Sequence, residues 1–364
     1  MGRTKGSKNK KELAPGLYGT KDGTLIIGKK IKADLNHTIN LMVGNPKIDL
    51  TVNPGNKDNE IQPPVIKVEL IKEELERKEK LNSVLKSINK NLGKESIKYA
   101  NTIEERKRIP FKQKCLNKLT GGGLPEGTYT TIWGGKGCSK TTIVLDVIAE
   151  AQRMNKTCAY VNGERSYDPV WAKKRGVDTD KLIVIDVETI EEGLDVVIKL
   201  CREKVADLII FDSIHGLAPK GELYEGKAEK EKSVAQDTMA LRARKMTQFF
   251  EMATSFVAEA KCAVVLIAQS RMDLSGFIKL EHLTGGHALM HFSRLIMRVR
   301  RGQKADAPTE KRKTGKITEK GKDEMEDVQV GFDLVVHVDK SQIPGCTEGD
   351  EIHVSFNYKE GITE

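Results

Sequence analysis

Residues 130–142 read TTIWGGKGCSKTT, and this stretch constrains the fold more than any other part of the chain. Its apolar beginning predicts a buried strand, its glycines predict a loop, and the residues from Lys140 onward predict a helix. The apolar positions of that helix fall on one face and are Ile143, Val144, Val147, Ile148 and Ala151. A strand, a glycine-rich loop and a helix in this order bind phosphate groups, because backbone N–H groups of the loop and the helix N-terminus point at the anion.

The loop departs from the usual phosphate-loop pattern at one position. The pattern G-x-x-x-x-G-K-[ST] is met by Gly134, Lys140 and Thr141, but Ser139 stands where the second glycine belongs. A Cβ atom there could crowd the phosphates, and serine is the mildest such intrusion. Lys140 would reach the terminal phosphates of ATP, and the Thr141 hydroxyl would ligate Mg²⁺. The expected nucleotide-binding residues here are Gly134, Gly135, Lys136, Gly137, Cys138, Ser139, Lys140, Thr141 and Thr142.

The composition is that of a globular protein rather than a membrane or secreted one. Hydrophobic residues make up 38% and charged residues 31% of the 364 positions, and no apolar run approaches the roughly 18 residues that span a membrane. The N-terminus lacks the apolar stretch of a signal peptide, and the six cysteines include no C-x-x-C pair. We expect a cytoplasmic protein that does not contact a membrane. The net charge of +9 permits a polyanionic partner but does not identify one.

Residues 1–65 are expected to form an N-terminal extension with a basic tip. Two short apolar runs, 25–27 and 48–52, could be strands of a small β element, or the segment could be a disordered arm that orders on a partner. The basic tip is either a solvated tail or a nucleic-acid contact. Its charged residues are Arg3, Lys5, Lys8, Lys10 and Lys11.

Residues 66–98 are expected to contain a helix over 68–92, which ends before Gly93. Its apolar residues form a regular stripe, which we call the helix stripe, made of Leu81, Val84, Leu85, Ile88 and Leu92. A stripe this regular must pack on something, either its own domain or a neighbouring subunit. We expect the helix to serve subunit packing.

Beyond the phosphate loop, apolar runs alternate with helical patterns, which indicates an α/β fold with a mostly parallel central sheet flanked by helices. The expected strands are 157–162, 182–186, 208–212 and 263–268, and the expected helices are 168–175, 190–203 and 236–260. In such sheets ligands bind beyond the carboxyl ends of the strands. Asp212, Glu164 and Gln269 all follow strands, and in phosphate-loop enzymes such residues hold Mg²⁺, polarise the attacking water and sense the γ-phosphate.

In sequence and order, these motifs resemble the bacterial RecA recombinase family, including its phage-encoded members. The resemblance covers roughly residues 66–302 and, more loosely, 328–362, and it includes GGLPEG at 122–127 and DPVWA at 168–172. It implies a RecA-like ATPase core at 99–302 in which Glu164 is the catalytic glutamate, aided by Lys140 and Gln269. It also implies that Asp168 and Trp171 border the adenine and that Asp212 holds the Mg²⁺.

The resemblance extends to the C-terminal part of the chain. Residues 338–343 resemble the segment that reaches a neighbour's nucleotide, with Lys340 as its catalytic lysine, and Tyr358 resembles an adenine-stacking tyrosine. Residues 328–364 would therefore be a β segment that completes the core. Between the two parts we expect residues 303–327 to be a mobile, basic insertion or linker.

The function implied by this resemblance is an ATP- and single-stranded-DNA-dependent recombinase. Such a protein forms helical homo-oligomeric filaments on DNA and pairs them with double-stranded DNA, in the nucleoid or, if phage-encoded, in the host cytoplasm. Its two DNA-binding loops would lie at 221–237 and 269–286. The implied DNA contacts are Arg244, Arg271, Gly285 and Gly286, with Phe277 and Ile278 as apolar wedges between bases. The alternative is a DNA-binding mediator with weak or absent hydrolysis because of Ser139; a replicative helicase is a third reading.

Overall fold

The structure is a computed structural model of the chain. It describes residues 11–14, 17–19, 25–27, 68–92, 97, 100–225, 230–231, 241–272, 281–283, 287–303, 307–317 and 323–363. The chain divides into two compact units, Met1–Glu104 and Glu105–Glu364.

The first unit contains a small antiparallel sheet and one long helix. Strands β1 (Lys11–Ala14), β2 (Leu17–Gly19) and β3 (Leu25–Ile27) form the sheet in sequence order. The strand predicted at 25–27 is therefore present, whereas the one predicted at 48–52 lies outside the described residues.

Helix α2 (Val68–Leu92) has the bounds expected from the sequence. Its stripe is not buried: Leu81 is 47% exposed, Val84 48%, Ile88 38% and Leu92 55%, and Leu85 is half-buried. Within its own unit, the described residues therefore give these apolar side chains little cover.

The second unit is built on a ten-stranded sheet with β6 (Thr128–Gly134) near its middle. Five consecutive pairings are parallel and three at one edge are antiparallel. The strand order is β19 (Gly361–Thr363), β18 (Glu351–Asn357), β17 (Gly331–Ser341), β14 (Ser293–Arg301), β6, β12 (Ala263–Met272), β9 (Leu208–Asp212), β7 (Cys158–Asn162) and β8 (Ile183–Asp186), with β13 (Glu281–Leu283) paired to β12. The predicted parallel-rich α/β fold is confirmed.

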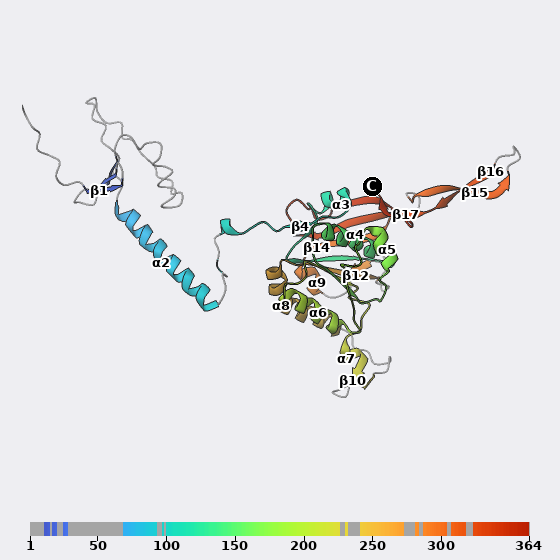
Figure 1. Cartoon of the computed structure of the whole chain (residues 1–364), viewed down its shortest axis with the longest axis horizontal. Helices are drawn as coiled ribbons and strands as arrows, with labels where there is room; N and C mark the ends of the chain where they lie inside the picture. The colour runs from blue at the N-terminus through green and yellow to red at the C-terminus, as the bar shows by residue number, and fades with distance from the viewer. Residues whose placement is uncertain are drawn as a thin grey trace, which may run out of the picture. The chain divides into compact units, whose positions relative to one another are not determined.

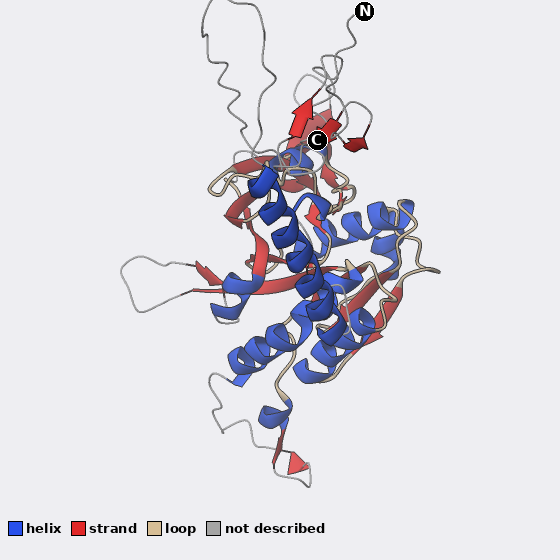
Figure 2. Cartoon of the chain, turned by 90° about the vertical axis from the view of Figure 1, so that its left-hand side faces the viewer, coloured by secondary structure: helices blue, strands red, loops and turns tan. Residues whose placement is uncertain are grey.

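Helices cover both faces of this sheet (Figures 1 and 2). One face packs against α3 (Lys114–Leu119), α4 (Lys140–Arg153) and α5 (Pro169–Arg175). The other face packs against α6 (Ile190–Arg202), α8 (Leu241–Ala260) and α9 (His287–Phe292). The predicted helices and strands agree with these bounds closely, except that β12 runs four residues past Ala268 and residues 236–240 lie outside the described part.

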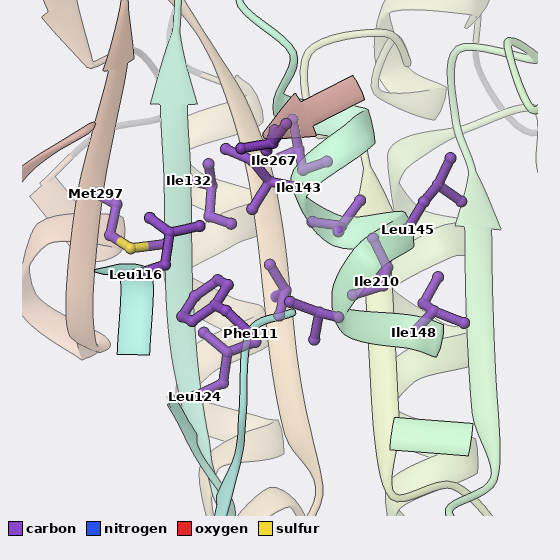
Figure 3. Close-up of a cluster of buried hydrophobic side chains, with 14 of the residues drawn as sticks. Phe111, Leu116, Leu124, Ile132, Ile143, Leu145, Ile148, Ile210, Ile267 and Met297 are labelled. Atoms are coloured by element: carbon purple, nitrogen blue, oxygen red, sulfur yellow. The ribbon is translucent and has the colours of Figure 1, made fainter. Parts of the chain in front are cut away.

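The core beside the phosphate loop fixes the positions of β6 and α4. Figure 3 shows Phe111, Leu116 and Ile132 gathered with Ile143 of α4 and Ile267 of β12. All five are at most 2% exposed, and burying each contributes about 1.5–3 kcal/mol relative to leaving it in water. The strand end and the helix start that hold the loop are thus rigidly packed.

The region predicted to be a basic insertion or linker, 303–327, contains regular structure that the sequence analysis did not predict. Strands β15 (Thr309–Ile317) and β16 (Asp323–Gln329) form a two-stranded antiparallel ribbon. Opposite charges face each other across it, as with Lys311 and Asp327, and such pairs favour strand pairing over a coil. A count of charge alone could not reveal this pairing.

Candidate nucleotide and Mg²⁺ site

The loop between β6 and α4 turns through backbone conformations that favour glycine. Gly134 has φ +156°, and a Cβ atom there would lie 1.9 Å from the Val299 carbonyl oxygen of β14. Gly137 has φ +73°. Ser139, at the helix N-cap, is left-handed with φ 63° and ψ 23°, and its side chain makes no capping hydrogen bond. The chain thus places a non-glycine residue where the phosphate-loop pattern has glycine, without an evident compensating contact.

Lys140 begins α4 and points back into the loop. Its Nζ donates to the carbonyl oxygens of Gly134 at 3.0 Å and Gly135 at 2.7 Å. Burial lowers the pKa of Lys140, while neighbouring groups such as Asp212 and Glu164 act in the opposite direction. The ammonium group is therefore held inside the loop, where its positive charge would lie close to bound phosphates.

Asp212 is the last residue of β9 and is hydrogen-bonded to α4, the helix that follows the phosphate loop. Its Oδ2 accepts from the Thr141 hydroxyl at 2.8 Å and from the Tyr160 hydroxyl at 2.7 Å. Burial raises the pKa of Asp212, an effect that these two hydrogen bonds and Lys140 oppose. Mg²⁺ is commonly bound through one or two carboxylates together with substrate phosphates, so Thr141 and Asp212 form a donor set that fits this ion.

Glu164 lies just beyond the end of β7 and is tied to two neighbouring strands. Its Oε1 accepts from the Ser213 hydroxyl, and from Gln269 Nε2 at 2.6 Å. The backbone of Gly163 also donates to the Asp212 carbonyl at 2.7 Å. The structure therefore brings together three of the strand-end residues predicted from sequence, and Ser213 orients the glutamate further.

A cavity of about 590 Å³ opens beside Glu164. Its lining comes from the ends of β7 and β8 and the segment after β9, and consists of Gly163, Glu164, Arg165, Val187, Glu188, Gly216, Leu217 and Leu223. The cavity does not include the phosphate loop, so the phosphate position is assigned from the loop and Lys140 rather than from this cavity.

The residues predicted to border the adenine belong to α5. The Asp168 side chain caps this helix by accepting from the backbone N–H of Val170 at 2.8 Å and of Trp171 at 3.1 Å. The Trp171 indole donates to Thr142 of α4 at 3.2 Å. Asp168 therefore acts on helix α5, and Trp171 lies directly against the helix that carries the loop.

Tyr358 reaches the loop through a chain of contacts. Its ring lies 6.0 Å from that of Phe332, which Arg301 covers at 4.4 Å. Arg301 in turn donates to the Gly137 carbonyl from Nη2 at 2.9 Å. Sequence reasoning missed Arg301, although its place at the end of β14, next to β6 in the sheet, is a position where functional residues are expected. Tyr160 was missed for a simpler reason, since it lies within an apolar strand.

Lys340 does not touch its own phosphate loop in the described contacts. Its Nζ donates to the carbonyl oxygens of Met290 at 2.5 Å and His291 at 3.1 Å, near the C-terminus of α9. A lysine at this end of a helix satisfies carbonyl groups that lack intrahelical partners. The predicted contact with a neighbour's nucleotide thus requires Lys340 to exchange these partners.

The predicted DNA contacts are only partly described. Arg244 is exposed on α8, and Arg271 lies in the extension of β12. The remaining predicted contacts, Phe277, Ile278, Gly285 and Gly286, lie outside the described residues. Within the part that is described, no group of three or more His, Cys, Asp or Glu side chains could hold a metal ion, and no helix is long and apolar enough to cross a membrane.

These features define the class of protein. It is an α/β protein with a parallel-rich central sheet and a glycine-rich loop that joins its middle strand to a buried helix. Residues 79–328 match the family described as the RecA N-terminal domain. Because this match spans more than half of the chain, the chain belongs to the RecA family.

Curated relatives agree with this assignment. The chain is 37% identical over 230 residues to Protein RecA of Marinobacter nauticus, a match that covers 62% of this chain and 64% of that protein. It is 36% identical over 231 residues to Protein RecA of Haemophilus ducreyi, with 62% and 60% covered, and 34% identical over 236 residues to Protein RecA of Thermotoga maritima, with 64% of each covered. The chain thus spans less than two thirds of these relatives.

Among solved structures, a RadB recombinase is similar over 70% of this chain and 98% of that one, with a TM-score of 0.48 and 17% identity. A similarity this weak adds nothing to the family assignment.

Proposed function

We propose that this chain is a DNA-dependent ATPase that polymerises on single-stranded DNA and drives homologous pairing and strand exchange. The observation that carries the proposal is the joint arrangement of Lys140, Asp212 and Glu164 around one phosphate loop, in a chain of the RecA family. Each of these side chains comes from a different element, and each is oriented by hydrogen bonds.

The roles of these residues follow from their positions. Lys140 and the N–H groups of the loop stabilise the charge on the phosphates, and Thr141 with Asp212 holds Mg²⁺. When bound, Mg²⁺ would neutralise charge that develops on the phosphates. Glu164 accepts a proton from the attacking water, and Gln269 orients Glu164 through its 2.6 Å hydrogen bond. Trp171 and Tyr358 would border the adenine.

Gln269 also offers a route by which DNA could influence hydrolysis. It lies in β12, and the segment that follows this strand contains the second predicted DNA-binding loop. A shift of that segment on binding DNA would move the amide that orients Glu164. In this arrangement Arg244, Arg271 and the loop glycines would contact DNA phosphates, while Phe277 and Ile278 would lie between bases. DNA bound in this way would stimulate turnover.

The partners in this proposal are DNA and further copies of the chain. The exposed apolar stripe of α2 would pack on the next subunit, and Lys340 would leave the end of α9 to reach that subunit's nucleotide. A contact of this head-to-tail kind that does not close produces a helical filament. Such a filament would act in the cytoplasm, at the nucleoid or on the DNA of an infected host.

A second candidate, a DNA-binding mediator with weak or absent hydrolysis, is favoured by one observation. Ser139 adopts a left-handed conformation in which a side chain is strained, within the loop that must approach the phosphates. The two candidates differ only in turnover, so a measurement of hydrolysis separates them.

The test is ATP hydrolysis by the full-length chain with and without single-stranded DNA, together with imaging for filaments. We expect DNA to stimulate turnover and Lys140→Ala to abolish it while the melting temperature stays unchanged. Filaments without turnover in the unaltered chain would favour the mediator. Undiminished turnover in a normally folded Lys140→Ala variant would contradict the assigned site.

A further inference from the structure

The ribbon of β15 and β16 grows directly out of the central sheet. Gly302, just after β14, donates its N–H to the Asp333 carbonyl at 2.8 Å, and Val330 donates to the Pro308 carbonyl at 2.9 Å. Thr309 then pairs with Gln329 and the ribbon continues outward. Figure 1 shows it projecting beyond the strands that carry it. Its base is therefore fixed by the same strands, β14 and β17, that supply Arg301 and Phe332 to the nucleotide site.

The described side chains of the ribbon, at 309–312 and 325–329, form no apolar face that would need burial. Lys311 pairs with Asp327 on one face, and Arg312 pairs with Glu326 on the other. All four side chains are exposed. Among the ribbon's described side chains the one recorded ion pair joins Arg312 to Glu310 of the same strand, at 3.9 Å. The ribbon is therefore not a core element of its own chain.

The two strands carry opposite charge. The β15 segment TEKRKTGKI has four basic residues and one acidic residue, whereas the β16 segment DEMEDVQ has four acidic residues and no basic one. The described part of the chain adds no third strand, so each strand also forms one open edge of the ribbon. One edge is thus basic and the other acidic.

Charge on an open edge commonly prevents unwanted pairing between copies. That purpose is served by the same sign on both edges, because every pairing of two copies then brings like charges together. Opposite signs have a different result. Pairing β15 with β15, or β16 with β16, is still repulsive, but pairing β15 of one copy with β16 of the next is attractive.

We propose that the β15 edge of one copy binds the β16 edge of the next copy, so that the ribbons add a contact along the filament. Two copies in the same orientation bring these edges together antiparallel, and the contact repeats without closing. A nucleic acid is a poorer partner, since each basic residue of the pairs Lys311–Asp327 and Arg312–Glu326 faces an acidic one. The inference rests on the filament of the proposed function but not on hydrolysis.

Three variants of the full-length chain test this pairing by sedimentation at low salt, with ATP and without DNA. Changing three basic residues of β15 reverses its net charge and makes both edges acidic; these changes are Lys311→Asp, Arg312→Glu and Lys313→Glu. Changing three acidic residues of β16 reverses its net charge and makes both edges basic; these changes are Glu324→Lys, Glu326→Arg and Asp327→Lys. The sixfold exchange that combines them is the matched control, because it keeps the composition, the net charge and the opposite-charge pairs at 311/327 and 312/326 while it swaps the sign of the two edges.

We expect each threefold variant alone to associate about tenfold more weakly than the unaltered chain. A one-to-one mixture of the two should associate like the unaltered chain, since acidic and basic edges then alternate. The sixfold exchange variant should associate normally by itself but poorly with the unaltered chain.

The pairing is overturned if the threefold variants associate normally, if their mixture stays as weak as either alone, or if the sixfold exchange variant fails to associate. It is also overturned if only the affinity for single-stranded DNA changes, which would make nucleic acid the occupant. If the unaltered chain shows no DNA-stimulated hydrolysis but its association still depends on the ribbon charges, the proposed function is contradicted and the ribbon pairing is not.

Discussion

The nucleotide site differs from two exposed features of this chain, the helix stripe of α2 and the ribbon. The difference is whether the side chains and strand edges involved find partners within the chain. At the site, Lys140, Asp212 and Glu164 all have hydrogen-bond partners within the chain. By contrast, four apolar residues of the helix stripe are 38–55% exposed, and no further strand of the described part of the chain pairs with either edge of the ribbon. The side chains of the proposed nucleotide site are thus organised within one chain, whereas under the proposed function the helix stripe and the ribbon edges find their partners in further copies.

Lys340 of β17 combines properties of both: it has partners within the chain, yet the proposed function requires it to contact a neighbouring copy. It is located at the surface, yet it is engaged with the carbonyl groups of Met290 and His291 on α9. Because α9 follows the second predicted DNA loop, an exchange of these contacts for a neighbour's phosphates would link assembly, DNA and hydrolysis.

The largest effect on stability is expected from the interior behind the nucleotide site. Arg175 of α5 donates to Asp146 of α4 from Nε at 2.7 Å and from Nη2 at 2.6 Å, and also to the Glu360 carbonyl. Asp146 is fully buried, and Arg175→Ala leaves its carboxylate without an opposite charge, although Gln113 still donates to it at 2.7 Å. The free energy of unfolding should therefore fall by about 3–5 kcal/mol. Urea unfolding measures this loss.

A double variant, Asp146→Leu with Arg175→Leu, is the control for this prediction. It removes both charges together, and its loss should be smaller than that of Arg175→Ala. A change below about 1 kcal/mol on Arg175→Ala would show that this interior is not closed in the way described.

Lys340→Ala should affect assembly-linked turnover more than stability. Two helix-end carbonyls lose a donor, which should lower the free energy of unfolding by about 1 kcal/mol. ATP binding should be unchanged, because Lys340 does not touch its own phosphate loop among the described contacts, while stimulation of hydrolysis by DNA should fall. Nucleotide titration measures ATP binding, and an ATPase assay measures the stimulation by DNA. A loss of ATP binding would contradict the proposal that Lys340 acts on a neighbour's nucleotide rather than its own.

Ser139→Gly should have the smallest effect. Glycine adopts the observed φ of 63° without strain but adds freedom to the unfolded chain, so the free energy of unfolding should change by less than about 1 kcal/mol. Turnover should be kept or raised. A large loss of turnover at unchanged stability would reveal a chemical role for the hydroxyl.

Much of the fold could be predicted because its signals are local. The phosphate loop, the strand ends at Asp212 and Glu164, and helix α2 each depend on periodicity or short motifs, and each appears at the expected place. Arg301 could not be predicted to contact Gly137, since the two are 164 residues apart and meet only through the order of strands in the sheet. The ribbon was missed because a count of charge over 303–327 does not reveal how two strands align.

The most direct test of the central contrast is Leu85→Asp in the helix stripe. Leu85 is only half-buried, so the charge should leave a folded chain that binds ATP like the unaltered protein. Sedimentation and ATPase assays with ATP and single-stranded DNA should then show no filaments and no stimulation of turnover by DNA. Filaments of normal length with normal DNA-stimulated turnover would contradict the account, and a globally unfolded variant would show that the stripe packs within its own chain.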